Sequence, residues 1–141
     1  MKLPVLLSIR GRQCYAEAEP EIIELVTTGT LEEIDGGWDI VYQETDLTGM
    51  EGVTTAFRAE PGKITLTRSG NLNSQMVFQE GVSHQSLYQM PFGALMITVC
   101  ATDIRWNITE NGGVVDLVYG IEIENSAAGT VEYHLEITPV K

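Results

Sequence analysis

The sequence predicts an all-β protein that folds as one antiparallel, up-and-down barrel of about eight to ten strands. Over residues 115–124 and again over 131–138, apolar residues occupy every second position, and the positions between them are polar or glycine apart from Val118. Each segment therefore has one apolar face and one mostly polar face. Turn residues divide the rest of the chain into pieces of strand length, and no window shows capped helical periodicity. A sandwich would also fit, but long strands joined by tight turns favour a closed barrel.

Three turn signals indicate hairpins between neighbouring strands. Asp35-Gly36-Gly37 separates two apolar runs, and Glu60-Pro61-Gly62-Lys63 has Pro and Gly where a type II turn needs them. Asn111-Gly112-Gly113 likewise supplies residues that tolerate positive φ before the long alternating segment. Strands that are consecutive in the sequence are therefore expected to be neighbours in the sheet.

The segment from Glu17 to Leu25 is the one ambiguous element. Pro20 could open a short helix, because proline suits the first helical turn. We favour a strand, since apolar and β-branched residues from Ile23 to Leu31 keep one parity and Pro20 can simply begin it.

The composition indicates a single globular domain and excludes some classes of partner. The 141 residues fit one domain spanning 1–141, with 43% apolar and 20% charged residues, which is ordinary globular usage. Twenty acidic and eight basic residues give a formal charge of −12. Such a surface repels phosphate backbones and anionic lipid, so neither nucleic acid nor a membrane is an expected partner.

Metal, cofactor and targeting signals are weak throughout. Cys14 and Cys100 are far apart and form no Cys-x-x-Cys or His-Cys pattern, so we expect reduced thiols and neither metal nor cofactor. The apolar run near the N-terminus is interrupted by Pro4 and closed by Arg10, and it is too short for a signal peptide. The expected location is cytoplasmic.

A polar region in the middle of the chain breaks the strand pattern and holds the candidate site. Amides and hydroxyls crowd around Arg68, and acidic residues that include Asp46 occupy a strand connection that could meet it at one barrel mouth. A guanidinium binds carboxylates and similar anions in a bidentate manner, and amides add directional contacts. The candidate ligand-binding residues are Glu44, Glu51, Arg68, Asn73, Ser74, Gln75 and Tyr88. The alternative is a loop that satisfies its own backbone, with Arg68 paired to a carboxylate.

Several separated motifs resemble one bacterial family. Gly49-x-Glu51-Gly52, Arg68-x-Gly70, Ser74-x-Met76-x-Phe78-x-x-Gly81, Tyr88-x-x-Pro91-x-Gly93 and Gly112-Gly113 are similar in order and spacing to the YwiB-like domain of unknown function. Met90 departs from the Thr expected before the proline. The resemblance covers nearly the whole chain and implies a calycin-like, lipocalin-like barrel without an assigned activity.

Three functional hypotheses follow. The first is a non-enzymatic barrel that binds a small polar or anionic molecule at the mouth built by residues 44–55 and 68–93. The second is an interaction protein with a filled barrel, whose partner is another protein or a second copy of the chain as a homodimer. The third is an enzyme that uses Arg68, a carboxylate and His84, which requires those groups around one cleft. A hollow interior would favour the first, and a filled one with an apolar outer patch would favour the second.

Overall fold

The computed structural model describes residues 2–14, 19, 21–44, 51–70, 72–90, 93–124 and 126–140, with only the backbone described for 88–90 and 126–128. These residues form ten strands and no helix. The strands are β1 (Lys2–Cys14), β2 (Glu21–Ile34), β3 (Gly37–Gln43), β4 (Val53–Glu60), β5 (Lys63–Gly70), β6 (Ser74–Gln79), β7 (Ser83–Met90), β8 (Gly93–Thr109), β9 (Gly112–Ile123) and β10 (Ser126–Pro139).

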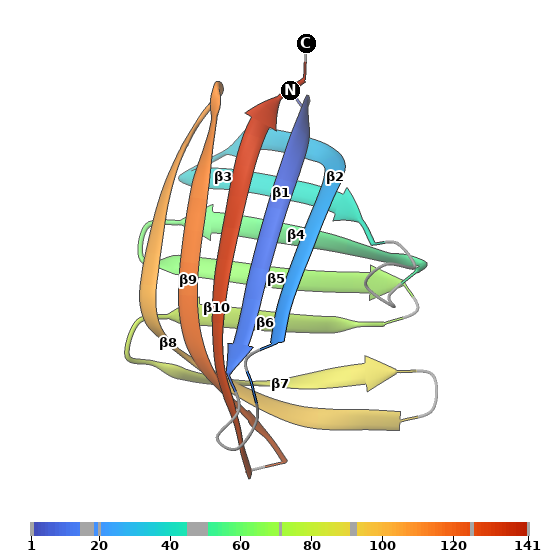
Figure 1. The fold of residues 1–141 in the computed structure, drawn as a ribbon, viewed down its shortest axis with the longest axis vertical. Coiled ribbons are helices and arrows are strands. Elements are labelled where there is room, and N and C mark those ends of the chain that lie inside the picture. The colour runs from blue at the N-terminus through green and yellow to red at the C-terminus, as the bar shows by residue number, and fades with distance from the viewer. Residues whose placement is uncertain are drawn as a thin grey trace.

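The strands form one sheet in the order β6-β5-β4-β3-β2-β1-β10-β9-β8-β7, and every paired neighbour is antiparallel. The sheet curls into a nearly closed barrel, with β1, β2, β9 and β10 crossing in front of β3 to β7 (Figure 1). The predicted all-β, up-and-down barrel is confirmed.

The predicted hairpins are present, and glycine conformation explains two of them. Gly36 has φ of 85° between β2 and β3, and Gly62 has φ of 72° between β4 and β5. Gly62 follows Pro61, which is the arrangement of a type II turn. β2 runs from Glu21 to Ile34, so the ambiguous segment is a strand from Glu21 onward; Glu17 and Pro20 lie outside the described residues.

Up-and-down topology gives the barrel two different ends. The short connections β2–β3, β4–β5, β6–β7 and β8–β9 lie at one end, together with the start of β1 and the end of β10. The other end carries the strand ends at Cys14, Gln43, Gly70, Met90 and Ile123. We refer to this second end as the mouth.

The barrel has a seam between its two outermost strands, β6 and β7. In the described chain, Gln79 and Val82 form an isolated antiparallel bridge at the tight turn, and Glu80 bridges Ala101 of β8. His84 Nε2 lies 2.7 Å from Gln79 Oε1, and Gly81 N donates to Ala101 O at 3.0 Å. The two strands are thus joined at the hairpin end and diverge toward the mouth (Figure 1).

The interior at the hairpin end, which we call the packed half, is filled by side chains. Leu7, Leu31, Ile40 and Leu135 are each 0% exposed. The other residues of the packed half are also buried: Val5, Ala59, Ile64, Ile108, Val115 and Ile137. Trp106 Nε1 donates to the carbonyl of Glu60 at 3.0 Å and ties β8 to the β4–β5 turn. Burying each large aliphatic side chain stabilises the fold by roughly 1.5 to 3 kcal/mol.

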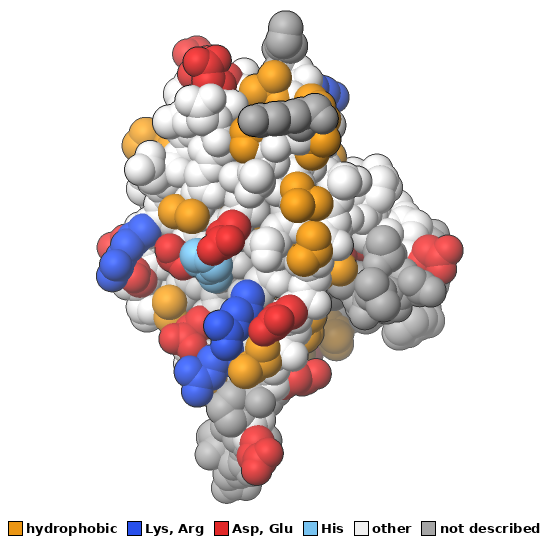
Figure 2. Space-filling view, turned by 45° about the horizontal axis from the view of Figure 1, so that its top comes forward, with side chains coloured by type: hydrophobic (Ala, Val, Ile, Leu, Met, Phe, Trp, Pro, Cys, Tyr) orange, Lys and Arg blue, Asp and Glu red, His pale blue; other side chains and the backbone are white. Residues whose placement is uncertain are grey.

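The outer face of β1, β2, β9 and β10 gathers several of the basic residues. Arg10 and Arg12 pair with Glu24 and Glu132 across neighbouring strands, at 3.7 and 3.4 Å. His134 Nδ1 lies 2.5 Å from Asp116 Oδ1. Figure 2 shows this mixture of charges beside a column of apolar side chains. The exposed apolar residues that β1 and β2 present on this outer face are Leu6, Ile22 and Val26.

Candidate functional site: a cavity in the mouth half of the barrel

The mouth half of the barrel interior contains a cavity of about 550 Å³. Most of its wall is apolar, and polar side chains enter where strands end. The apolar lining is Ile9, Ile23, Leu25, Phe57, Leu66, Met76, Phe78, Ile97, Leu117, Ile121 and Val131, and the polar lining is Gln13, Glu21, Tyr42, Glu44, Arg68, Tyr119 and Tyr133. Glu21 and Ile23 are also exposed, so the cavity reaches solvent at the mouth. Its size falls within the range of pockets that hold small organic ligands.

Strand register explains how the lining is built. Gly11 of β1 lies opposite Ile23 of β2 and Tyr133 of β10, and all three face the cavity. A Cβ added to Gly11 would meet no heavy atom within 4 Å. The missing side chain at Gly11 therefore contributes to the space inside the barrel.

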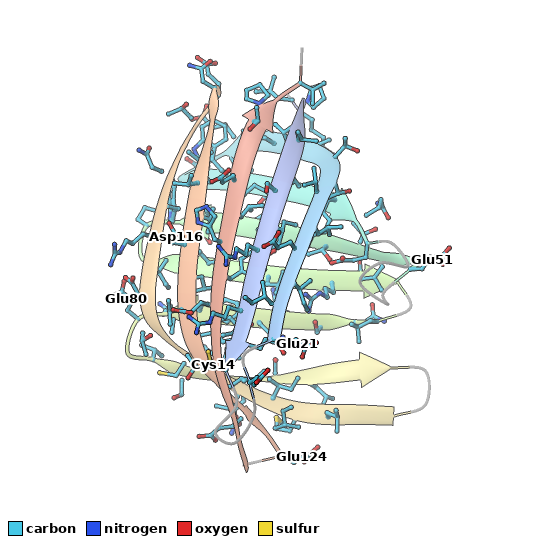
Figure 3. The ribbon with its side chains drawn as sticks, in the orientation of Figure 1. Cys14, Glu21, Glu51, Glu80, Asp116 and Glu124 are labelled. Carbon is cyan, nitrogen blue, oxygen red and sulfur yellow. The ribbon has the colours of Figure 1, made fainter. Side chains whose placement is uncertain are left out.

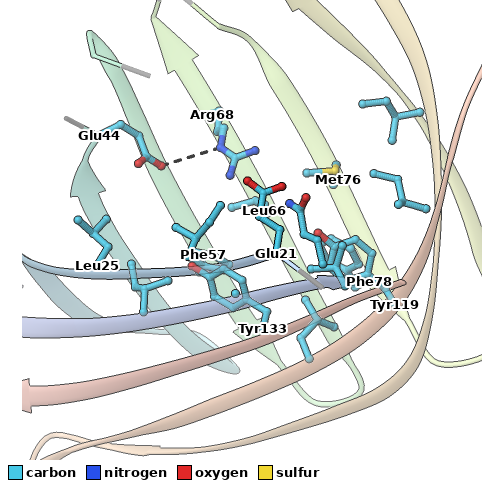
Figure 4. A pocket seen from close by; sticks show the side chains of 18 of the residues that line it. Glu21, Leu25, Glu44, Phe57, Leu66, Arg68, Met76, Phe78, Tyr119 and Tyr133 are labelled. Atoms are coloured by element: carbon cyan, nitrogen blue, oxygen red, sulfur yellow. Dashed lines mark ion pairs between the residues drawn. The ribbon is translucent and has the colours of Figure 1, made fainter. Parts of the chain in front are cut away.

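Glu44 is the centre of the polar cluster. Its side chain is 1% exposed, and it lies just beyond the end of β3. Thr55 Oγ1 donates to Glu44 Oε2 at 2.5 Å, and Arg68 Nε lies 4.0 Å from the same oxygen (Figure 4). Arg68 is 15% exposed, so the pair is largely buried. Buried charges need this kind of pairing, because the desolvation of a lone ion costs several kcal/mol.

Two tyrosines extend the cluster into the cavity. Burial raises the pKa of Tyr42 to about 12, with a further contribution from the charge of Glu44. The Tyr42 hydroxyl hydrogen-bonds Glu44 and also Tyr133. Burial likewise raises the pKa of Tyr133 well above its usual value, because the interior disfavours the charged phenolate, and a hydrogen bond to Tyr42 raises it further. Both phenols stay neutral at physiological pH and act as hydrogen-bond donors.

Three of the predicted site residues meet inside the barrel. Glu44 and Arg68 line the cavity and form an ion pair. Ser74 pairs with Arg68 in the β5–β6 register and is 7% exposed. Its Oγ has no hydrogen-bond partner among the described residues. The structure therefore contains the carboxylate partner of Arg68 that the alternative interpretation required, and it places that pair on a cavity wall.

Glu51, Asn73 and Gln75 do not line the cavity. Glu51 is exposed and projects outward just before the start of β4 (Figure 3). Asn73 donates from Nδ2 to the carbonyl of Gly70 at 3.1 Å, which stabilises the β5–β6 turn. Gln75 faces outward between two inward residues of β6. Tyr88 belongs to β7, but its side chain lies outside the described part of the structure, as does all of Asp46.

The histidine of the enzyme hypothesis lies elsewhere. His84 contacts Gln79 at the seam and does not line the cavity that contains Glu44 and Arg68. No group of three or more His, Cys, Asp or Glu side chains suited to a metal ion occurs among the described residues. Cys14 and Cys100 are free, half-buried thiols.

The sequence did not indicate Gln13 and Glu21 as site residues. They pair directly across β1 and β2, and both line the cavity. They lie at strand ends, next to a connection whose conformation the sequence left open. Tyr42 and Tyr133 carried a usable signal, because they share the parity of inward residues. Parity alone does not separate core packing from cavity lining, and the structure places both on the cavity wall.

The comparisons with known proteins identify the family. A family model described as a domain of unknown function, DUF1934, matches residues 7–137. The chain belongs to this family. Curated protein sequences give no match. Membership therefore supports the YwiB-like resemblance without supplying an activity.

A solved structure supports the same fold. The crystal structure of the YwiB protein from Bacillus subtilis is similar over 99% of this chain and 94% of that chain, with a TM-score of 0.88. The sequence identity is 20%, so this likeness establishes the barrel architecture alone. The described residues include no helix long and apolar enough to cross a bilayer.

Proposed function

We propose that this protein binds a small amphipathic molecule inside the mouth half of its barrel. The observation that carries the proposal is a largely apolar cavity of about 550 Å³ with a polar cluster at one side. Apolar walls with a few placed polar groups are the usual composition of ligand pockets. The filled interior that the interaction hypothesis required is limited to the packed half.

The polar cluster gives the cavity an orienting element. Glu44 and Arg68 offer an acceptor and donors side by side, and the Tyr42 and Tyr133 hydroxyls add neutral groups. An apolar ligand body would contact rings and aliphatic side chains deeper in the barrel, such as Phe57. This division supports a ligand with one polar end.

The proposal is tested by filling the cavity from Gly11. Replacing Gly11 with Leu places a side chain in open space inside the cavity, and Gly11 has no left-handed φ that would strain the new residue. The probe is N-phenyl-1-naphthylamine, an uncharged dye whose fluorescence rises in apolar surroundings. We expect saturable binding by the wild type and at least a tenfold weaker affinity for Gly11→Leu.

Gly120→Leu is the matched control. Gly120 is also a strand glycine with nothing within 4 Å of an added Cβ, but it lies between two cavity-facing residues, Tyr119 and Ile121, and so faces outward. Its dye affinity should equal that of the wild type. Circular dichroism and thermal unfolding check that both variants fold. A wild type that does not bind the dye, or equal binding by Gly11→Leu, would reject the cavity as a ligand site.

A second candidate function is self-association through the outer face of β1 and β2. Ile22 and Val26 are 49% and 63% exposed there, beside the Arg10–Glu24 pair. Paired charges of both signs make this face less repulsive to a second acidic copy than the rest of the surface. Sedimentation velocity of the wild type and Val26→Glu tests it: a dimer that the substitution dissociates supports self-association, whereas a monomer at all concentrations excludes it.

A further inference from the structure

We propose that the ligand of the cavity is a cationic amphiphile, with an apolar body inside the barrel and an ammonium group held at the mouth by Glu21. This inference rests on the proposed binding function and specifies the chemical class of the ligand. The site is the cavity itself, and the charges of its described lining determine which head group it accepts.

The charge of Arg68 is already compensated. Glu44 lies 4.0 Å from Arg68 Nε and is the more deeply buried of the two. An anionic head group would have to approach Arg68 next to that carboxylate, so like-charge repulsion would offset its attraction to the guanidinium. Arg68 is the only basic residue among the described lining, which also includes Glu21. The formal charge of the lining is therefore −1, and Glu21 supplies it.

The position of Glu21 suits an ammonium group. It is the first residue of β2, it is exposed, and it faces the cavity opposite Gln13 of β1 (Figures 3 and 4). An ammonium group at this position would keep part of its hydration while donating to the Glu21 carboxylate. A charge at the rim avoids the several kcal/mol that complete burial of an ion costs.

The surroundings of the mouth favour the same sign of charge. Glu19, Glu51 and Glu124 are exposed and lie in the chain next to the strand ends of the mouth. In the sequence, the segments 15–20, 44–52, 71–73, 91–92 and 124–125 contain no Lys or Arg. With a formal charge of −12 on the chain, an approaching cation is attracted and an anion is repelled.

An unfilled polar position lies beside the cluster. Ser74 is opposite Arg68 in register and 7% exposed, and its Oγ has no hydrogen-bond partner among the described residues. A buried hydroxyl without a partner is destabilising, because no hydrogen bond replaces its lost hydration. Ser74 does not itself line the cavity, but Arg68 opposite it does, so a polar group of the ligand that reaches past Arg68 could satisfy this hydroxyl. This observation is independent of the acidic residues.

The test compares three ligands that differ only in the head group. Octylamine, octanol and octanoate each compete with bound N-phenyl-1-naphthylamine at neutral pH, where the amine is protonated because alkylammonium groups have a pKa near 10.4, as in lysine. We expect octylamine to displace the dye at about one fifth of the octanol concentration, the ratio typical of an exposed ion pair. Octanoate should be the weakest competitor. High salt should reduce the differences, since it screens exposed charges.

Glu21→Gln and Glu24→Gln separate a specific contact from net charge. Both residues are exposed on β2 and each substitution removes one negative charge, but Glu24 faces outward and pairs with Arg10. Glu21→Gln should remove the advantage of octylamine over octanol and leave octanol unchanged. Glu24→Gln should preserve that advantage.

The outcomes distinguish this inference from the proposed function. Octanoate competing as well as octylamine, or an unchanged amine-to-alcohol ratio in Glu21→Gln, would reject the cationic class while leaving the cavity as a binding site. Dye binding that is absent in the wild type, or unaffected by Gly11→Leu, would reject the binding function and this inference with it.

Discussion

The two halves of the barrel interior are built from the same ten strands and differ in what fills them. The packed half buries Leu7, Leu31, Ile40 and Leu135 completely, whereas the mouth half surrounds a cavity of about 550 Å³. Tight hairpins border the first, and the strand ends near Glu21, Glu44 and Arg68 border the second. The packed half therefore stabilises the fold, and the mouth half is available for binding.

The largest difference in unfolding free energy is expected when the same Leu→Ala substitution is made in each half. Leu135→Ala should cost about 4 kcal/mol of unfolding free energy, because it removes buried contacts and leaves an enclosed void. Leu25→Ala should cost about 2 kcal/mol, because Leu25 already borders the cavity and mainly the transfer contribution is lost. Urea denaturation measures both. Equal losses would show that the cavity wall is packed as tightly as the core.

The buried ion pair tests whether the mouth half depends on polar contacts. Glu44→Gln should destabilise the fold by about 3 kcal/mol, because it removes the carboxylate that faces Arg68 in a largely buried position. The double variant Glu44→Gln/Arg68→Met should recover part of the loss, since neither charge then remains. Unfolding free energies of the two single variants and the double variant measure this coupling. Strictly additive losses would mean that the two side chains do not interact.

The ionisation of Tyr42 should make the free energy of unfolding depend on pH. Its pKa in the folded state is about 12, above the ordinary value of 10.0, so the folded state disfavours the phenolate. The resulting stability is fully present below pH 10 and is lost as the pH rises through 12, by about 3 kcal/mol in total at 1.36 kcal/mol per pKa unit. Urea denaturation across this range, with Tyr42→Phe as control, measures the loss. The same slope in the variant would assign the effect to other groups.

The smallest change in unfolding free energy is expected from His134, on the outer face of the barrel. Hydrogen bonds to Asp116 and Glu136 raise the pKa of His134, so its contribution is fully present below the unfolded-state pKa of about 6.5. That contribution is lost as the pH rises through the higher folded-state pKa. His134 is 39% exposed, which limits the effect to less than about 1 kcal/mol. His134→Gln should flatten the stability profile near neutral pH, and an NMR titration of the wild type should show the raised pKa.

The fold was accessible from the sequence because its signals are local. Gly36 and Gly62 mark turns that need positive φ, and the alternation on β9 and β10 fixes which residues face inward. Arg68 and Glu44 could be selected as partners because they are a cation and an acid in a polar region. Glu21 could not be selected, because its place on the cavity wall depends on the β1–β2 register beyond an ambiguous segment. The sequence also could not predict whether side chains fill the interior, because that depends on packing between strands that are distant in the sequence.

The seam between β6 and β7 affects how the width of the cavity can change when a ligand binds. A barrel closed by a complete ladder has a circumference fixed by its backbone hydrogen bonds, so widening it means breaking them. Here the two outermost strands meet through the bridge of Gln79 and Val82 near the hairpin end. Among the described residues no β6–β7 ladder continues from this bridge toward the mouth, so a change in the width of the cavity at the seam would break no ladder between neighbouring strands.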